Sequence, residues 1–128
     1  MRIEEIMTTD VITIGPPATV RTASKLMREK GVGSLIVKEN NKAIGIVTER
    51  DILNRVTSKK IRPSSINVGK IMSSPLLCVS PEKDVKDAAR LMIEKSIRRL
   101  PVSDKHGSCI GIVTERDIMK GLLKMLSG

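Results

Sequence analysis

One nine-residue stretch occurs twice in the sequence, and this repeat constrains the fold more than any other feature. Residues 44–52 and residues 110–118 both read Ile-Gly-Ile-Val-Thr-Glu-Arg-Asp-Ile. Each copy opens with a short apolar run containing β-branched residues, which predicts a buried strand. The pattern then becomes helical at Thr48 and at Thr114, and Thr is a favourable N-cap residue. An internal repeat predicts duplicated structural units, so we expect two copies of one strand-and-helix unit.

The similarity between the two halves extends over nearly the whole chain. The offset between matching positions is 65 up to the second hairpin turn, 104–107, and 66 after it. Each half is predicted to form a strand, a helix, two further strands and a second helix. In the first half, these elements are expected at residues 11–14, 20–30, 34–37, 44–47 and from 49 onward. The predicted fold class is α/β, in the α+β sense, with two pseudo-symmetric motifs.

Local signals predict where these elements begin and end. Thr19 is expected to cap the first helix and Gly31 to terminate it. The polar turn that contains residues 40–41 is predicted to use left-handed Asn conformations. Residues 76–79 are expected to form the strand that opens the second half. The helix after Thr48 is expected to bury three residues: Ile52, Leu53 and Val56.

The repeat also predicts the domain organisation. The first motif is expected at 1–57 and the second at 68–128. Residues 58–67 form a polar, basic stretch interrupted by Pro63, which is typical of a linker. Since a half of ~60 residues buries little surface alone, the two motifs are expected to pack together around a cleft.

Composition narrows the possible partners and compartment. The chain has 128 residues, no Phe, Tyr or Trp, and a formal charge of +9, which favours anionic partners. Without aromatic rings, a bound purine cannot stack on one. The cysteines, Cys78 and Cys109, form no C-x-x-C motif and favour reduced thiols, which predicts a cytoplasmic location. No apolar run approaches the ~20 residues of a membrane span, so we expect no membrane association.

The repeated strand-to-helix junction is the principal candidate site. The start of a helix presents backbone N–H groups and attracts phosphate. We predict that Thr48 with Asp51, and Thr114 with Asp117, line two nucleotide sites. An Asp carboxylate can accept hydrogen bonds from vicinal ribose hydroxyls, and a Thr hydroxyl can donate to phosphate. The alternative is that Thr-x-x-Asp is only a capping box, which needs no ligand.

One arginine stands in the first helical turn after each junction. Arg50 and Arg116 there oppose the helix dipole, by ~0.3–1 kcal/mol when exposed. A bound anion would offset that cost, which makes both residues candidate phosphate ligands. The alternative is an exposed Arg paired with a carboxylate such as Glu49.

These features together resemble a tandem pair of cystathionine β-synthase (CBS) domains. The resemblance rests on Ile6-Met7 and Ile71-Met72, on Leu100-Pro101-Val102, and on the two Gly-Ile-Val-Thr-Glu-Arg-Asp blocks. It implies that the two motifs form one Bateman-type module and that modules pair as homodimers. It also implies that the clefts bind AMP, ADP, ATP or another adenosyl compound, such as S-adenosylmethionine.

The resemblance further implies which residues contact the ligand. The ribose and phosphate roles fall on the two Thr-x-x-Asp blocks, and the base is expected against strands of the opposite half. Val11, Ile12 and Thr13 are therefore expected near the Thr114 site. Leu77, Cys78 and Ile97 are expected near the Thr48 site. Arg98 and Arg99 are candidate phosphate ligands, with a solvated basic edge as the alternative.

The predicted function is a non-catalytic regulatory module that senses adenine nucleotides and signals to a partner, which is another protein or a nucleic acid. No cofactor is required; the regulatory ligand is the nucleotide, with or without Mg²⁺. Nothing resembles a catalytic set. His106 lies alone in a polar turn, and Cys78 is interpreted as a small buried residue. Two alternatives remain: weak, salt-dependent nucleic-acid binding, and a purely structural dimerisation module.

Overall fold

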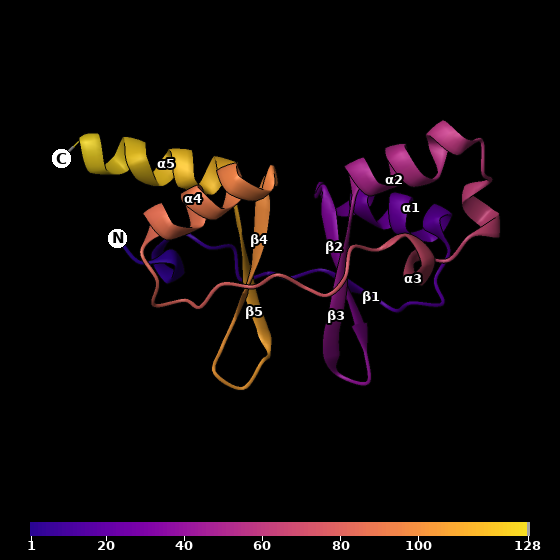
Figure 1. Cartoon of the computed structure of the whole chain (residues 1–128), viewed down its shortest axis with the longest axis horizontal. Helices are drawn as coiled ribbons and strands as arrows, with labels where there is room; N and C mark the ends of the chain where they lie inside the picture. Colours follow the sequence, from indigo (N-terminus) through magenta and orange to yellow (C-terminus); the bar gives the residue numbers. More distant parts are fainter. Residues whose placement is uncertain (128) are drawn as a thin grey trace. The chain divides into compact units, whose positions relative to one another are not determined.

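The computed structural model describes residues 1–127, which form two compact units (Figure 1). The central unit comprises Ile12–Leu76, and the terminal unit comprises Met1–Val11 together with the chain from Leu77 onward. Each unit therefore includes the lead-in segment of the other repeat. Ile3 is buried in the core of the terminal unit, and Val68 is buried in the core of the central unit.

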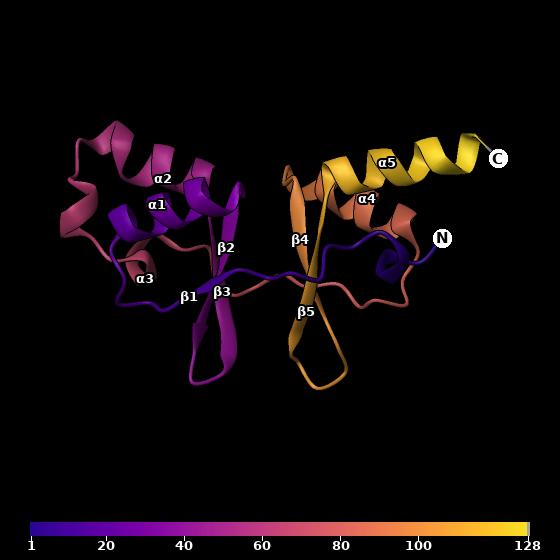
Figure 2. The same ribbon diagram turned by 180° about the vertical axis from the view of Figure 1, so that it is seen from behind.

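The central unit holds a three-stranded sheet and the helices of the first repeat. Its elements are β1 (Thr13–Ile14), α1 (Val20–Lys30), β2 (Ser34–Glu39), β3 (Lys42–Thr48), α2 (Glu49–Arg55), η2 (Thr57–Lys59), η3 (Pro63–Ser65) and α3 (Val68–Ile71). Strand β2 lies between β1, which is parallel to it, and β3, which is antiparallel. In views from both sides, the β2–β3 turn projects away from α1 and α2 (Figures 1 and 2). Asn40 and Asn41 in this turn have positive φ angles, as predicted.

Helix α1 follows the sequence-based expectation at both ends. The Thr19 hydroxyl accepts a hydrogen bond from the backbone N–H of Thr22, and Gly31 ends the helix in a left-handed conformation. Val20, Ala23 and Met27 are buried. In α2 the expectation is partly wrong, because the side chain of Leu53 is 57% exposed.

Residues 58–67 belong to the central unit and pack against its core. The amide of Ile61 donates to the carbonyl of Val56, and the carbonyl of Ile66 accepts from Val20. Both isoleucine side chains pack against the aliphatic core. The neighbouring cations Lys59, Lys60 and Arg62 are exposed.

The terminal unit repeats this arrangement with a smaller sheet. Its elements are η1 (Ile3–Glu5), α4 (Val85–Lys95), β4 (Arg99–Ser103), β5 (Cys109–Thr114) and α5 (Glu115–Leu126). Strands β4 and β5 are antiparallel. The strand expected at 76–79 is reduced to one parallel bridge between Val79 and Val102. Pro75 and Pro81 lack the N–H that a longer ladder needs, and they bracket this segment.

The glycine of each repeated block is required by close packing. A Cβ on Gly45 would lie 2.7 Å from the sulfur of Met72 and 2.9 Å from the carbonyl oxygen of Ser73. A Cβ on Gly111 would lie 2.8 Å from the sulfur of Met7 and 3.0 Å from a backbone oxygen. The Ile-Met lead-ins and the Gly of the block are therefore packing partners within each unit.

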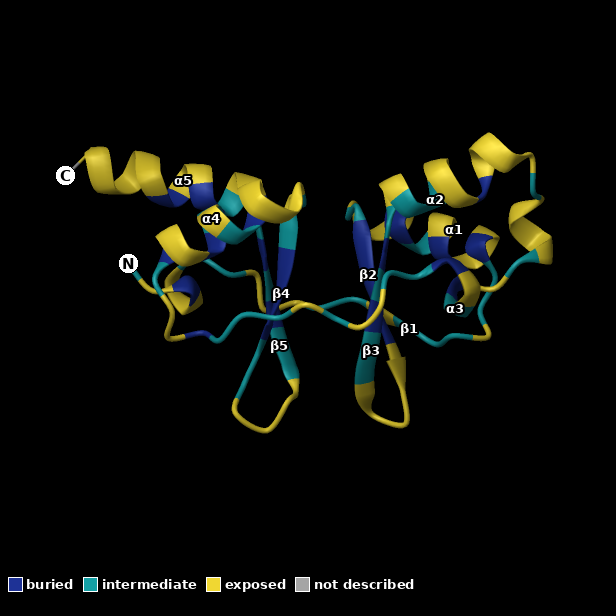
Figure 3. Cartoon of the chain, viewed as in Figure 1, coloured by how far each residue is buried: buried dark blue, intermediate teal, exposed yellow. Residues whose placement is uncertain are grey.

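Helix α5 is longer than α2 and exposes much of its surface (Figure 3). Ile118 and Gly121 are buried, whereas several other apolar side chains are exposed: Met119, Leu122, Leu123, Met125 and Leu126. Among the described residues, no helix is both long and apolar enough to span a lipid bilayer.

Candidate functional site

The strand-to-helix junction of the central unit is a closed capping box. The backbone N–H of Thr48 donates to Oδ2 of Asp51 at 2.9 Å, and the N–H of Asp51 donates to the Thr48 hydroxyl oxygen at 3.1 Å. The N–H of Glu49 donates to the carbonyl of Gly33 at 3.1 Å. The capping alternative is therefore confirmed as a role of this block, and the N–H groups of residues 48, 49 and 51 are already satisfied within the chain.

The second carboxylate oxygen of Asp51 is also engaged within the central unit. Oδ1 accepts a hydrogen bond from the hydroxyl of Ser73 at 3.2 Å and lies 3.9 Å from a guanidinium nitrogen of Arg55. Arg55 in turn donates to the carbonyls of Ile71, at 2.6 Å, and Met72, at 3.2 Å. This arginine joins α2 to the end of α3 and holds Asp51 in place.

The junction of the terminal unit has the same capping box but a different surrounding. The N–H of Thr114 donates to Oδ2 of Asp117 at 2.9 Å, and the N–H of Asp117 donates to the Thr114 hydroxyl oxygen at 3.1 Å. Within residues 1–127, no hydrogen bond or ion pair is found for Oδ1 of Asp117. Gly121 stands here in place of Arg55, and a Cβ at Gly121 would make a tight contact of 3.1 Å with Ile6.

The candidate phosphate ligands differ in their surroundings. Arg98 is 81% exposed, and its Nε lies 3.8 Å from a carboxylate oxygen of Glu115. Such an exposed pair contributes little to stability, so the guanidinium can exchange partners. Arg99 begins β4 and is half-buried, whereas Arg50 and Arg116 are exposed in the first turns of α2 and α5.

The residues expected around the base are distributed between the units. In the central unit, Ile12 accepts a hydrogen bond from Ile36 and packs against the core, while Thr13 is exposed in β1. In the terminal unit, Val11 is half-buried, Leu77 is exposed and Ile97 packs against the core. Their assignment to a particular nucleotide site stays a prediction.

Cys78 is half-buried in the terminal unit. Burial raises the pKa of its thiol, and a hydrogen bond with the Ser103 side chain opposes this in part. A raised pKa leaves little thiolate at neutral pH, so Cys78 is a weak nucleophile. This agrees with its interpretation as a small buried residue.

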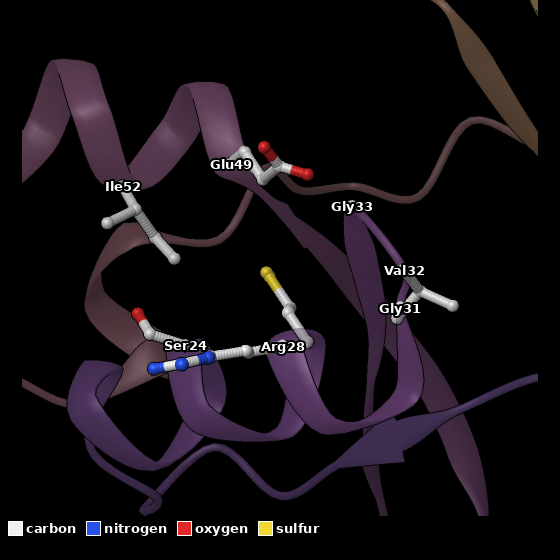
Figure 4. Close-up of a pocket in the computed structure, with 8 residues that line it drawn as sticks. Ser24, Arg28, Gly31, Val32, Gly33, Glu49 and Ile52 are labelled. Carbon is white, nitrogen blue, oxygen red and sulfur yellow. The ribbon is translucent and has the colours of Figure 1, made fainter.

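A hollow of about 500 Å³ lies between α1 and α2 in the central unit (Figure 4). Eight residues line it: Ser24, Met27, Arg28, Gly31, Val32, Gly33, Glu49 and Ile52. In Figure 4, Ser24 and Arg28 from α1 lie opposite Glu49 and Ile52 from α2. The sequence analysis did not predict this hollow, because helical periodicity shows which side of a helix is apolar but not how far two helices separate. Within the described residues, no group of His, Cys, Asp or Glu is suited to hold a metal ion.

The structure and sequence together define the family. The CBS domain family matches this sequence twice, over residues 3–58 and 68–124. These two matches span most of the chain, so the protein belongs to the CBS domain family and carries a tandem pair of these domains. The predicted resemblance and fold class are confirmed. Tandem CBS modules are generally regulatory and non-catalytic.

Similar proteins occur in archaea and bacteria. The chain is 42% identical to a protein of Methanopyrus kandleri over 119 residues, which cover 92% of this chain and 61% of that protein. A solved structure of a protein with CBS domains from Burkholderia ambifaria has a TM-score of 0.92 and 30% identity, over 97% of this chain and 95% of that one. A hexameric CBS-CP12 protein from cyanobacteria has a TM-score of 0.86 and 39% identity, over 93% and 66%.

Proposed function

We propose that this tandem CBS module is a regulatory sensor that binds adenine nucleotides or a related adenosyl compound at its Thr-x-x-Asp junctions. The observation that carries the proposal is the carboxylate of Asp117. One of its oxygens is fixed by the helix cap, and the other has no protein partner within residues 1–127. A fixed carboxylate oxygen with spare acceptor capacity suits the vicinal hydroxyls of a ribose.

The neighbouring groups supply contacts for phosphate. The Thr114 hydroxyl oxygen accepts from Asp117, so its own proton remains available to donate. Arg116 and the weakly paired Arg98 are cations near the same junction, since Glu115 donates its N–H to the carbonyl of Arg98 at 2.8 Å. Guanidinium groups bind phosphate through paired, charge-assisted hydrogen bonds.

The two junctions are expected to bind the nucleotide with unequal affinity. At the Thr48 junction, a ribose must share or displace the contacts that Ser73 and Arg55 make with Asp51. At the Thr114 junction, this competition is lacking in the described chain. The Thr114 site is therefore proposed to be the tighter one, and its arginines favour ligands with more phosphates.

Isothermal titration of the whole chain with AMP, ADP, ATP and S-adenosylmethionine tests the proposal. Asp117→Asn is the test variant, because Asn retains a capping oxygen but loses the carboxylate charge. Asp87→Asn on the exposed surface of α4 is the matched control. We expect saturable binding of at least one ligand by the wild type and the control, and weaker binding by Asp117→Asn with an unchanged circular dichroism spectrum. Equal binding by both variants would remove Asp117 from the site.

Signalling requires that the ligand bind two conformations with different affinity. The proposed receiver is a protein partner of the module.

Self-association is also proposed, because exposed apolar side chains gather on α5 and hexameric CBS proteins occur among the structural relatives. Sedimentation analysis is expected to show a homodimer.

A second candidate function is nucleic-acid binding, which the charge distribution favours. The central unit contains twelve Lys and Arg residues and four Asp and Glu residues, a formal charge of +8. Such binding would depend on phosphate contacts alone, because the chain has no aromatic residue to stack on a base. Fluorescence anisotropy with labelled DNA would then show an affinity that falls steeply between about 50 and about 200 mM salt, because phosphate contacts release bound counterions.

A further inference from the structure

Two stretches of the central unit carry all of its excess charge. Residues 12–28 and residues 52–76 contain no Asp or Glu, and they hold three and five Lys or Arg residues respectively. Between them, residues 29–51 contain four basic and four acidic residues and are formally neutral. The formal charge of +8 therefore lies entirely in the two stretches that lack carboxylates.

The fold brings these two stretches together. The N–H of Val20, at the start of α1, donates to the carbonyl of Ile66 at 2.9 Å. The N–H of Val68, at the start of α3, donates to the carbonyl of Ala18 at 2.8 Å. Helix α1 and η3 also contact each other. In Figures 1 and 2, the segment that follows α2 lies at the end of this unit away from its strands, and it is largely exposed (Figure 3).

Six exposed cations lie on these joined segments, and we call them the basic patch: Arg21, Lys25, Lys59, Lys60, Arg62 and Lys70. Within residues 1–127, none of the six forms an ion pair with a carboxylate. The remaining two cations have other surroundings, since Arg28 lines the hollow and Arg55 contacts Asp51. The apolar residues Ile61 and Ile66 pack against the core, so the patch itself is polar.

The second repeat shows that the fold does not require this charge. Glu5 stands where the other repeat has Lys70, and Asp87 stands where it has Thr22. The terminal unit as a whole has eleven basic and ten acidic residues, a formal charge of +1. Two units with the same elements thus differ by seven formal charges, and the basic patch belongs to the central unit alone.

The composition of the patch suits phosphate groups better than a protein partner. Protein interfaces have an apolar centre that is depleted of charged residues, whereas protein–DNA interfaces are polar and strongly basic. Among the described residues, Leu53 is the one large exposed apolar side chain of the central unit. The patch therefore lacks the apolar centre that a protein partner would need.

The absence of aromatic residues favours a duplex over a single strand. Proteins that bind single strands stack the unpaired bases on aromatic rings, and this sequence has none. The bases of a duplex are already paired and stacked. A duplex also presents one phosphate charge per about 1.7 Å of its axis, so contacts to phosphate alone can hold it.

We infer that the basic patch binds the phosphate backbone of a double-stranded nucleic acid without contacts to its bases. This inference rests on nucleic-acid binding, the second candidate function, and specifies the surface and the form of the nucleic acid. Contacts of Arg and Lys with phosphates position a protein on a duplex but carry no sequence information. Affinity is then independent of base sequence and depends on salt according to the number of cations engaged.

Fluorescence anisotropy of the whole chain with labelled DNA duplexes of two unrelated sequences, measured over a range of salt concentrations, tests the inference. The test variant removes three charges of the patch: Arg21→Gln, Lys59→Gln and Arg62→Gln. The matched control removes three exposed charges of the terminal unit: Lys83→Gln, Lys86→Gln and Arg90→Gln. A second test variant, Lys25→Gln with Lys70→Gln, changes other elements of the patch. Circular dichroism verifies the fold of each variant, and the single strand and poly-glutamate are the comparison probes.

The inference predicts equal affinity for the two duplexes and weaker binding of both comparison probes. The test variant is expected to bind the duplex roughly tenfold more weakly or worse, with a salt slope smaller by about one unit per lost contact. The control is expected to keep both the affinity and the slope of the wild type.

Three results would overturn the inference while nucleic-acid binding itself stands. They are equal losses in test and control variants, wild-type affinity in both test variants, and tighter binding of the single strand than of the duplex. Tighter binding of poly-glutamate than of the duplex would also overturn it and indicate an acidic protein partner. No duplex binding by the wild type would refute the second candidate function as well, and nucleotide binding by titration would still be judged separately.

Discussion

Asp51 and Asp117 occupy the same place in a repeated sequence, but their carboxylates have different neighbours. Both accept a hydrogen bond from their own helix cap. Only Asp51 also contacts Ser73 and Arg55. The arginine contact has no counterpart at the second junction, because Gly121 stands where the first repeat has Arg55. Identical local sequence therefore produces two chemically different sites.

This difference predicts unequal losses of stability. Asp117→Ala removes a helix cap, which is expected to lower the free energy of unfolding by about 1 kcal/mol. Asp51→Ala removes a cap and also leaves Ser73 and Arg55 without their carboxylate partner, so we expect a loss of about 2 kcal/mol. Urea denaturation followed by circular dichroism measures both values. Equal losses would show that the contacts of Asp51 with Ser73 and Arg55 contribute nothing.

We expect the folding stability to depend on pH through Asp84, the N-cap of α4. The N–H of Lys86 donates to its carboxylate and lowers the pKa of Asp84 below its ordinary value of 3.8. A carboxyl group whose pKa is lowered by folding stabilises the fold above its unfolded pKa, and this stabilisation is lost as pH falls through the folded pKa. The wild type is therefore expected to unfold at higher urea concentration than Asp84→Asn at pH 7, and the difference should disappear in acid. A difference that persists once the carboxyl group is protonated in the folded state would contradict this assignment, since Asn and a protonated Asp are both neutral.

At the scale of elements, the strand that carries each repeated glycine packs directly on a lead-in segment. This close approach explains why Ile-Met and Gly recur together, and no ligand is needed to explain it. The sequence predicted the helices, the caps at Thr19 and Thr48, and the hairpins, because these depend on local periodicity and turn chemistry. It could not predict the exposure of Leu53, because the side of a helix that is covered depends on its neighbours.

The packing of Gly45 predicts a large effect of a small substitution. Gly45→Ala places a methyl group within 2.9 Å of a backbone oxygen and is expected to cost about 1–3 kcal/mol of folding stability through overpacking. Gly15→Ala is the matched control, because its methyl group would meet only an ordinary contact with Pro17 at 3.6 Å. Thermal unfolding of both variants measures the effect. Similar melting temperatures for the two would show that the strand and the lead-in separate at little cost.

At the scale of the whole molecule, the lead-in segment of each repeat is part of the unit that contains the other repeat. Ile3 is buried with the second repeat, and Val68 is buried with the first. The repeat correctly indicated duplicated elements, but its offset could not show this exchange, because Ile3 and Val68 have the same local pattern and either could pack on either unit. The candidate site was predicted from Thr48, Asp51 and their counterparts. The contacts of Asp51 with Ser73 and Arg55 could not be predicted from the sequence, because Ser73 lies 22 residues away from Asp51 in the chain.

The central claim is that the Thr-x-x-Asp junctions bind an adenosyl ligand. Amide chemical-shift mapping by ¹H–¹⁵N NMR, during titration of the whole chain with AMP, ATP and S-adenosylmethionine, tests it most directly, because it reports location as well as affinity. The account predicts saturable shifts that begin at residues 114–117, at lower ligand concentration than any shifts at residues 48–51. Saturable shifts confined to other parts of the chain, or no saturable shift with any of these ligands, would contradict it.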